Sequence, residues 1–404
     1  MPLLRTGRRG PRTALSTGVV VLLTALAVWA LPAAPAAAQA QRVESWGHNG
    51  YGQLGDGTTH ERHTPVTVAG LTAAGVTHLA SGGGHGLAAL ANGTVKAWGA
   101  NDYGQVGDGT TSDLSDPDHL TPGTVRDLSG VTAVAAGCLH SVALLANGTV
   151  RAWGNNYSGQ LDGTTGGLST TPVTVVDPGN PGAPLRRVIA IAAGCDHTLA
   201  LLSDGTVRAW GDNSSGQLGT GTIGGSTGTP VAVVGLTGVR DIDAGLAHSL
   251  ALRGTGTVRA WGDNSDGQLG NGSIGGETGT PGLVVGLTGV RDVDAGYSHS
   301  LALRTDGTVR AWGDNSDGQL GNGSVGGASG TPAPVVGLTG VRQIAAGDLH
   351  NLARLSDGTL RAWGHNSDGR LGDGSTTDSG TPVLVRTGIA GVTRLAAGGF
   401  SLAA

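Results

Sequence analysis

The sequence predicts an all-β protein that folds as a closed propeller of seven four-stranded blades. Glycine accounts for 76 of the 404 residues, aromatic residues for 3% and charged residues for 13%. Glycine costs about 1 kcal/mol relative to alanine at each helical position, so the composition argues against a mainly helical chain. Short strands joined by tight turns fit this composition, and two signatures that each recur seven times set the number of blades.

The amino-terminal region is predicted to be a secretory signal peptide outside the fold. Residues 1–40 hold four arginines and no acidic residue, and the apolar run VVVLLTALAVWALPAAPAAA follows the arginines. A basic start, an apolar middle and a small-x-small end are typical of such a signal, with cleavage after Ala40 or, as an alternative, after Ala38. Two prolines near the end favour cleavage over an uncleaved membrane anchor. We therefore expect residues 41–404 to be secreted, by the general or the twin-arginine route.

The charge of the mature chain argues against nucleic acid as a partner. Without the four arginines of the signal, 20 basic residues face 29 acidic ones, which gives a net charge of −9. A phosphate backbone is bound by clustered positive charge, and the mature chain has no basic run. It also has no further apolar stretch of about 18 residues, so we expect no membrane insertion after cleavage.

The first recurring signature contains a tryptophan in the pattern W-G-x-N-x-x-G. Successive copies are 52, 55, 57, 51, 51 and 51 residues apart. A buried aromatic side chain stabilises more than any smaller apolar one, so we expect each tryptophan to fill the space between neighbouring sheets. The seven structural tryptophans are Trp46, Trp98, Trp153, Trp210, Trp261, Trp312 and Trp363.

The second signature, A-G-x-x-H-S-L-A-L, indicates how the ring is closed. Its copies are centred on Gly82, Gly137, Gly194, Gly245, Gly296 and Gly347, with a degenerate copy at Gly398. The mature chain begins with the tryptophan half of a unit and ends with the glycine half. One unit is therefore split between the two ends, and pairing of these ends would leave no open sheet edge. An open solenoid would instead need polar capping repeats.

Each unit is predicted to contain four short strands. In the unit that starts at Val290, VRDVDAG is the first strand, and apolar and polar residues alternate in HSLALRTDGTVRAWG, as is typical of half-buried strands. Asp306-Gly307 supplies the turn between the second and third strands. A Thr-Pro pair opens the fourth strand, and because proline cannot donate to a ladder, we place this strand outermost.

These motifs closely resemble the repeat of the regulator of chromosome condensation family, over essentially all of 41–404. The residues that carry the resemblance are W-G-x-N-x-x-G-Q-L-G-x-G, T-P-x-x-V and A-G-x-x-H-S-L-A-L at a period near 51. The resemblance implies a seven-bladed propeller closed by strands from both termini. The family includes a nucleotide exchange factor for a small nuclear GTPase, and a secreted bacterial relative inhibits β-lactamases. The resemblance does not fix a function.

The repeated polar residues are interpreted as structural. Six histidines occupy one slot of the repeat, and separate sheets would keep them from converging on one metal ion, so we expect no metal and no cofactor. The six are His85, His140, His197, His248, His299 and His350. Familiar nucleophile, zinc-protease and phosphate-loop motifs are absent from the sequence. We see no asymmetric polar cluster near the axis, so we expect no enzymatic activity.

Two cysteines share one slot in consecutive units. Cys138 and Cys195 both follow the central glycine of the second signature. An exported chain permits a disulfide between them, provided that their Cα atoms lie within about 7 Å. The alternative is that both are small buried residues without a bridge.

Departures from the repeat are the candidate binding residues, and they gather in the first half of the chain. We assign Tyr51, Tyr103 and Tyr157 to one loop slot that later units fill with serine, and tyrosine offers a large contact area at little entropy cost. An acidic insertion at 111–120 contributes Asp116 and Asp118, and a Pro/Gly insertion at 176–187 ends in Arg186 and Arg187. The later units are near-copies and offer little asymmetry.

We therefore expect an exported, monomeric, non-catalytic propeller that binds a protein or a surface glycan. The first alternative is a guanine-nucleotide exchange factor for a small GTPase, which the resemblance alone implies. The second is an inhibitor of an extracellular enzyme such as a β-lactamase. Ordinary divergence among duplicated units would explain the three tyrosines without any ligand.

Overall fold

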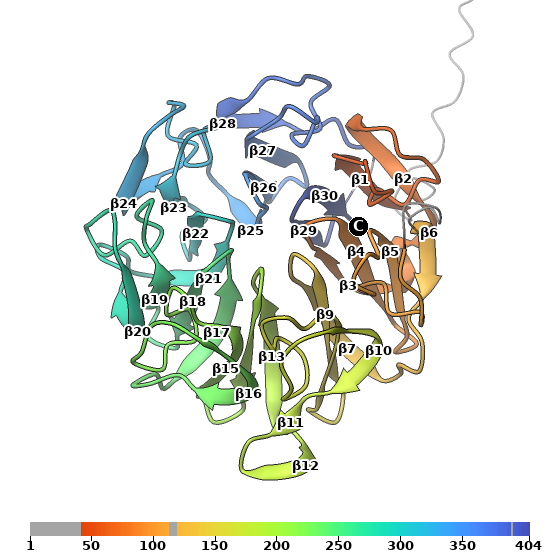
Figure 1. Cartoon of the computed structure of the whole chain (residues 1–404). Coiled ribbons are helices and arrows are strands. Elements are labelled where there is room, and N and C mark those ends of the chain that lie inside the picture. Colours follow the sequence, from red (N-terminus) through yellow and green to blue (C-terminus); the bar gives the residue numbers. More distant parts are fainter. Residues whose placement is uncertain (1–41, 113–118, 389–390) are drawn as a thin grey trace, which may run out of the picture. The chain divides into compact units, whose positions relative to one another are not determined.

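The computed structural model describes residues 42–112, 119–388 and 391–404, all of which belong to one compact unit, Ala36–Ala404. The predicted signal peptide lies outside the described residues, and so do Asp116 and Asp118. Seven four-stranded antiparallel sheets stand around a common axis in this unit (Figure 1). The expected all-β, seven-bladed propeller is therefore confirmed.

We number the blades from the first complete sheet, and strands are given in chain order. Blade 1 contains β3 (Val76–Ser81), β4 (His85–Leu90), β5 (Val95–Gly99) and β6 (His119–Thr124). Blade 2 contains β7 (Val131–Ala136), β8 (His140–Leu145), β9 (Val150–Asn155) and β10 (Leu168–Thr174). Blade 3 contains β13 (Val188–Ala193), β14 (His197–Leu202), β15 (Val207–Asp212) and β16 (Ser226–Ala232). Blade 4 contains β17 (Val239–Ala244), β18 (His248–Arg253), β19 (Val258–Asp263) and β20 (Glu277–Leu283).

The remaining three blades follow the same order with one exception. Blade 5 contains β21 (Val290–Ala295), β22 (His299–Arg304), β23 (Val309–Asp314) and β24 (Ala328–Pro334). Blade 6 contains β25 (Val341–Ala346), β26 (His350–Leu355), β27 (Leu360–Gly364) and β28 (Ser379–Leu384). Blade 7 contains β29 (Leu395–Ala397), β30 (Phe400–Ala403), β1 (Arg42–Gly47) and β2 (Arg62–Thr72).

Blade 7 closes the ring with strands from both ends of the described chain. Its order is β2-β1-β30-β29, and β1 pairs with β30 from Glu44 opposite Ala403 to Gly47 opposite Phe400. In every blade the glycine-half strand lies nearest the axis and the Thr-Pro strand lies at the rim (Figure 1). The predicted closure by mixed strands is thus confirmed, and it removes the open edges that a linear array would leave.

Two small elements lie outside the blades. A hairpin of β11 (Val176–Asp177) and β12 (Asn180–Pro184) extends beyond the rim between blades 2 and 3 (Figure 1). A 3-10 turn, η1 (Ala73–Gly75), links β2 to β3. Among the described residues, no helix has the length and apolar character needed to cross a bilayer.

The core consists of seven apolar clusters, each between two neighbouring blades. Every repeat tryptophan has 0% exposure and sits in one of them; Trp98 of blade 1, for example, packs among Val43 and Leu402 of blade 7. Its indole Nε1–H donates to the carbonyl of Gln53, 2.7 Å away, in blade 7. Because each cluster is shared by two sheets, no blade can bury its apolar faces alone.

Polar contacts link the same blades in a repeating pattern. In one junction, Ser249 Oγ donates to the carbonyl of Gln217 at 2.9 Å, and Trp261 Nε1 donates to the same carbonyl at 2.8 Å. The ring of His197 lies 2.9 Å from Ser249 Oγ through Nε2. Since the serine proton goes to the carbonyl, Nε2 must donate to the hydroxyl.

The six repeated histidines therefore lie in separate blade junctions. Burial lowers the pKa of His85 and of His197 to about 3, and that of His140 to about 4, so these rings are neutral at physiological pH. They hold neighbouring blades together and do not converge on a shared ion.

Candidate functional site

All loops that could form a site on one face leave from the same ends of the strands. The glycine turn between the first and second strands of a blade and the W-G-x-N loop between its third and fourth strands lie at one end, which we call the long-loop face. The two-residue turns between the second and third strands lie at the other end, which we call the hairpin face. The long-loop face therefore holds both signature loops of all blades.

The residue after the central glycine varies between units, and the fold brings its copies together at the axis. We call this set the axial ring. It consists of Gly83, Cys138, Cys195, Leu246, Tyr297, Asp348 and Gly399. Backbone bonds join several neighbours in it; the amide of Tyr297 donates to the carbonyl of Asp348 at 3.1 Å, and that of Leu246 to Tyr297 at 3.2 Å.

Cys138 and Cys195 form a disulfide in the axial ring. Their Cα atoms are 4.5 Å apart, and the bond links the glycine turns of blades 2 and 3. The hydroxyl of Tyr297, from blade 5 across the axis, lies 3.6 Å from Cys138 Sγ. One tyrosine therefore spans the long-loop end of the axis.

Behind the axial ring lies a cavity of about 110 Å³ that the inner strands line. Binding sites for drug-sized molecules measure roughly 300–1,000 Å³, so this cavity has room for a few waters and not for a substrate. Glycines such as Gly137 and Gly245 line it, and a Cβ at either would meet a neighbouring blade's carbonyl at under 2.5 Å. The glycine of the signature is thus required by the close approach of the inner strands.

Carboxyl groups line one side of the cavity. Asp243 Oδ2 accepts the amide N–H of Ala295 at 2.6 Å, and Asp294 Oδ1 accepts that of Ala346 at 3.1 Å. Each aspartate thereby satisfies an amide on the inner edge of the next blade. Burial raises the pKa of Asp243 to about 7 and raises that of its neighbour Asp294 as well, so the two share a site that disfavours double ionisation.

Asp348 is the third carboxyl of this region. Burial raises its pKa to about 7, although the Arg370 guanidinium and a hydrogen bond from Tyr297 favour its charged form. Burial also raises the pKa of the Tyr297 phenol, so this hydroxyl keeps its proton and can donate a hydrogen bond to the Asp348 carboxylate. The expectation of an axis without an asymmetric polar cluster is wrong, because Asp243, Asp294, Asp348 and Tyr297 all come from blades 4–6.

The three sequence-predicted tyrosines lie on the long-loop face in consecutive blades 7, 1 and 2, but they do not share one slot. The amides of Tyr51 and Tyr103 donate to the side chain of the glutamine two residues later, whereas in blade 2 Ser158, the residue after Tyr157, makes this contact. Tyr51 and Tyr157 are 48% and 63% exposed, and Tyr103 is half-buried. The rings of Tyr103 and Tyr157 contact edge to face with centroids 6.2 Å apart, and Tyr51 contacts His48 in the same way at 6.0 Å. These exposed aromatics form what we call the tyrosine arc.

The predicted arginines belong to the other end of the molecule. Arg186 is exposed, and Arg187 lies 3.6 Å from Asp204, in a two-residue turn of the hairpin face. The structure therefore separates Arg186 and Arg187 from the tyrosine arc by the length of the strands. A single surface cannot contain both sets.

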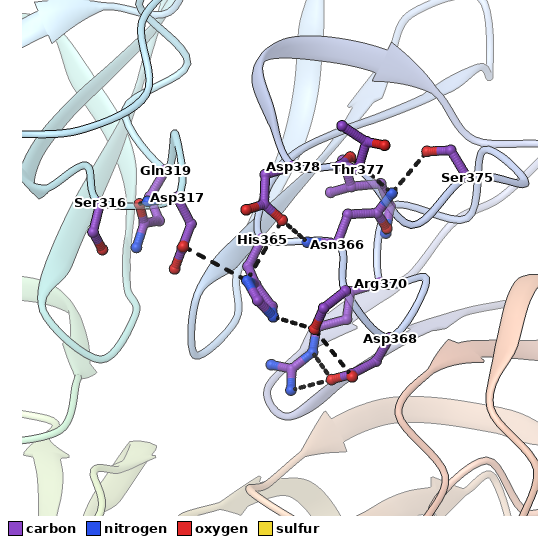
Figure 2. Close-up of polar contacts among 12 residues, drawn as sticks. Ser316, Asp317, Gln319, His365, Asn366, Asp368, Arg370, Ser375, Thr377 and Asp378 are labelled. Carbon is purple, nitrogen blue, oxygen red and sulfur yellow. Dashed lines mark hydrogen bonds and ion pairs between the residues drawn. The ribbon is translucent and has the colours of Figure 1, made fainter.

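The long-loop face also carries the one group of three possible metal ligands found among residues 42–112, 119–388 and 391–404. Asp317 of blade 5 faces His365 and Asp378 of blade 6, with all three ligand atoms within 4.8 Å of one another (Figure 2). Sequence reasoning missed this group, because its members lie 13 and 48 residues apart on two blades. The available signal was the change from W-G-D-N to W-G-H-N at His365.

A model of the RCC1-like domain matches residues 40–404. The chain belongs to the RCC1-like domain family. This RCC1-like chain is 30% identical over 351 residues to the ultraviolet-B receptor UVR8 of Arabidopsis thaliana. The aligned region covers 85% of this chain and 77% of that receptor. It is 34% identical over 324 residues to the E3 ubiquitin-protein ligase HERC2 of Homo sapiens, but spans 6% of that ligase.

Solved structures agree on the fold. Yeast RCC1 (Prp20), solved with Kap60 bound, superposes with a TM-score of 0.79 at 25% identity and covers 90% of this chain and 88% of its own. Human WBSCR16 superposes with a TM-score of 0.77 at 24% identity and covers 90% of this chain and 98% of its own. The RCC1-like propeller is therefore shared across proteins of different roles.

Proposed function

We propose that this RCC1-like propeller is an exported, non-catalytic protein-binding module whose partner docks on the long-loop face. The family supports a role in protein contacts, since its relatives include a receptor, a ubiquitin ligase and a propeller solved with a second protein bound. The observation that carries the proposal is the exposed tyrosine arc beside the axial ring. The small cavity behind that ring favours binding over turnover.

The chemistry of the face indicates what the partner presents. Tyrosines on blades 7, 1 and 2 offer apolar contact with a hydrogen-bonding tip, as in binding hot spots. Aspartates on the loops of blades 4–6, such as Asp263, Asp266 and Asp314, add negative charge on the other side of the axis. A partner segment with an apolar anchor and lysine or arginine side chains fits both halves.

The test compares the two faces. Mature protein carrying Tyr51→Ala, Tyr103→Ala and Tyr157→Ala is used as bait against culture supernatant and cell envelope, beside the unmodified protein. We expect the triple variant to lose at least about 10-fold in affinity for the captured partner, as hot-spot aromatics do. Arg186→Ala with Arg187→Ala, on the hairpin face, is the matched control and should bind normally.

Three outcomes would contradict the proposal. They are equal binding by the triple variant, loss of binding only in the arginine control, and a captured ligand that glycosidase removes, which would identify a surface glycan. Export is tested separately by finding residues from about 41 onward as the amino terminus of the secreted protein.

The exchange-factor and inhibitor alternatives have direct assays. The similarity to yeast RCC1 supports testing release of labelled GDP from bacterial GTPases, and titration against β-lactamases tests inhibition. We expect no acceleration of GDP release, because an exported propeller does not meet the nucleotide pool. Acceleration would favour the exchange factor, and stoichiometric loss of β-lactamase activity would identify the partner class.

A further inference from the structure

Three ligand atoms face one another at the junction of blades 5 and 6 (Figure 2). His365 Nδ1 lies 3.5 Å from Asp378 Oδ1 and 3.7 Å from Asp317 Oδ1. Nδ1 is buried and has no hydrogen-bond partner. Ionised carboxylates only accept, so nothing among these three groups supplies a proton unless the imidazole carries a second one. The arrangement therefore calls for a cation at its centre.

The hydrogen bond at Nε2 of His365 determines which ring nitrogen has a lone pair available for a metal ion. His365 Nε2 lies 2.6 Å from Ser367 Oγ, and that hydroxyl donates to Asp368 Oδ1 at 3.1 Å. Because the serine proton goes to Asp368, Nε2 donates and Nδ1 keeps its lone pair. Metal-binding histidines are held in this way, with the second ring nitrogen donating to a neighbour.

Asp378 is also held in place from behind. Its Oδ1 accepts the amide N–H of Asn366 at 2.7 Å, while the Asn366 side chain donates to the carbonyl of Thr377 at 3.1 Å. The ligand-bearing loop is thus fixed by bonds on both sides of Asp378. Side-chain exposures of 21% for His365, 26% for Asp317 and 34% for Asp378 leave the group accessible to solvent.

Blade 6 departs from the repeat at this point. The slot of His365 holds aspartate in blades 3–5, where Asp314, for example, accepts from Ser316 and from Gln319 Nε2 at 2.7 Å. In blade 6 the glutamine is replaced by Arg370, which forms an ion pair with Asp368 at 2.9 Å. No side-chain amide is therefore present to hydrogen-bond with Nδ1 of His365. The slot of Asp378 holds alanine in blade 5, Ala328. The three-ligand set is therefore particular to one junction.

We propose that His365 Nδ1, Asp317 and Asp378 bind a divalent transition metal ion of the Zn²⁺ class. Zinc accepts imidazole nitrogen and carboxylate oxygen at about 2.0–2.2 Å, so two ligands on a tetrahedral ion lie about 3.4 Å apart. The two nitrogen-to-oxygen separations are within a few tenths of an ångström of this value. A solvent-facing fourth position stays open for water, and the ion joins blade 5 to blade 6.

The experiment uses the full chain after treatment with EDTA and dialysis, titrated with Zn²⁺ by calorimetry and with Co²⁺ by visible absorption. We expect one ion per chain, with tetrahedral Co²⁺ bands. His365→Ala should abolish binding, and Asp317→Asn and Asp378→Asn should each weaken it at least about 10-fold. Ser367→Ala, which removes the support of Nε2, should weaken it about 10–100-fold.

His48→Ala is the matched control, because His48 holds the same slot in blade 7 but its Nδ1 is already 2.6 Å from the Gln53 amide nitrogen. It should leave Zn²⁺ binding unchanged. Circular dichroism of each variant distinguishes a lost ligand from a lost fold. The proposal is overturned if the unmodified chain binds no stoichiometric ion, or if a folded His365→Ala chain binds as before.

Discussion

Asp348 shows how one residue of the axial ring links charge to stability. Its carboxyl is held beside Tyr297 and Arg370 at the end of a narrow cavity, and burial raises its pKa from 3.8 to about 7. Between these two values the folded chain holds a proton that the unfolded chain has released. Stability contributed by this group is therefore lost as pH rises through that interval.

Asp348→Asn should remove this dependence. Asparagine is neutral at all pH values and can still accept from the Tyr297 hydroxyl. We expect the variant to be more stable than the unmodified chain by about 1–3 kcal/mol at pH 8 and nearly equal to it at pH 4, since cavity water relieves part of the desolvation. Urea unfolding at both pH values measures the gap, with the exposed Asp102→Asn as control. A gap of the same size at both pH values would contradict the explanation.

At the scale of the element, each blade is held by one carbonyl of its neighbour. The Gln217 carbonyl accepts from Trp261 and Ser249, and Ser249 accepts from His197. The carbonyl of blade 3 thus orders a tryptophan and a serine of blade 4, and the serine orders a histidine of blade 3. The junction depends on the hydroxyl, because it alone connects the backbone to the imidazole.

Ser249→Ala should therefore destabilise the chain out of proportion to its size. The His197 Nε2–H would be left buried without an acceptor, which costs about 1–3 kcal/mol. Ser249→Thr keeps the hydroxyl, and Thr198 already makes the same two contacts in blade 3, so this variant should cost less than about 1 kcal/mol. Chemical denaturation with both variants decides between a hydroxyl-specific and a purely steric effect.

The predictability of these elements depends on whether their residues recur. The blades and their closure could be predicted, because Trp98 and its six counterparts repeat with their neighbours and because the two half-units stand at opposite ends of the chain. Asp243 and Asp294 could not be placed at the axis, since only the fold shows that the residue two before the central glycine meets the next blade's inner edge.

The metal-ligand group was harder still to foresee. Asp317 has an equivalent in Asp266, and each looks like an ordinary turn residue within its own unit. Only the junction of two blades reveals that Asp317 faces His365, whereas Asp266 is placed near Asp314 and its pKa is raised by burial and by that like charge. The contact between Asp317 and His365 is made at one junction and is not repeated in the other units, so it leaves no periodic signal in the sequence.

At the scale of the whole molecule, closure of the propeller depends on blade 7. Its β1 depends on β30 for one ladder, and Phe400 and Leu402 of β30 pack in the same core cluster as Trp98 of blade 1. Loss of β30 would open two neighbouring junctions at once.

Deletion of residues 395–404 should consequently abolish cooperative unfolding or drive aggregation. It removes β29 and β30, strips Trp98 of partners and exposes the ladder edge of β1. Replacement of residues 177–183 in the rim hairpin by a short Gly-Ser linker is the control and should change the unfolding free energy by less than about 1 kcal/mol. Thermal unfolding and size-exclusion chromatography report both effects; a monomeric deletion variant with an unchanged melting temperature would show that closure is dispensable.

The pairing of β30 with β1 is also the contact that closes the ring of blades. Blades 4 and 5 are near-copies in sequence, so the contacts that they make with their neighbours do not distinguish one position in the ring from the next. The ring is complete only when β29 and β30 pair with β1 and β2. An array with one repeat too few or too many would form its internal blade junctions but not this closing one. The ladder between β1 and β30 is therefore the place where the seven-bladed ring is completed.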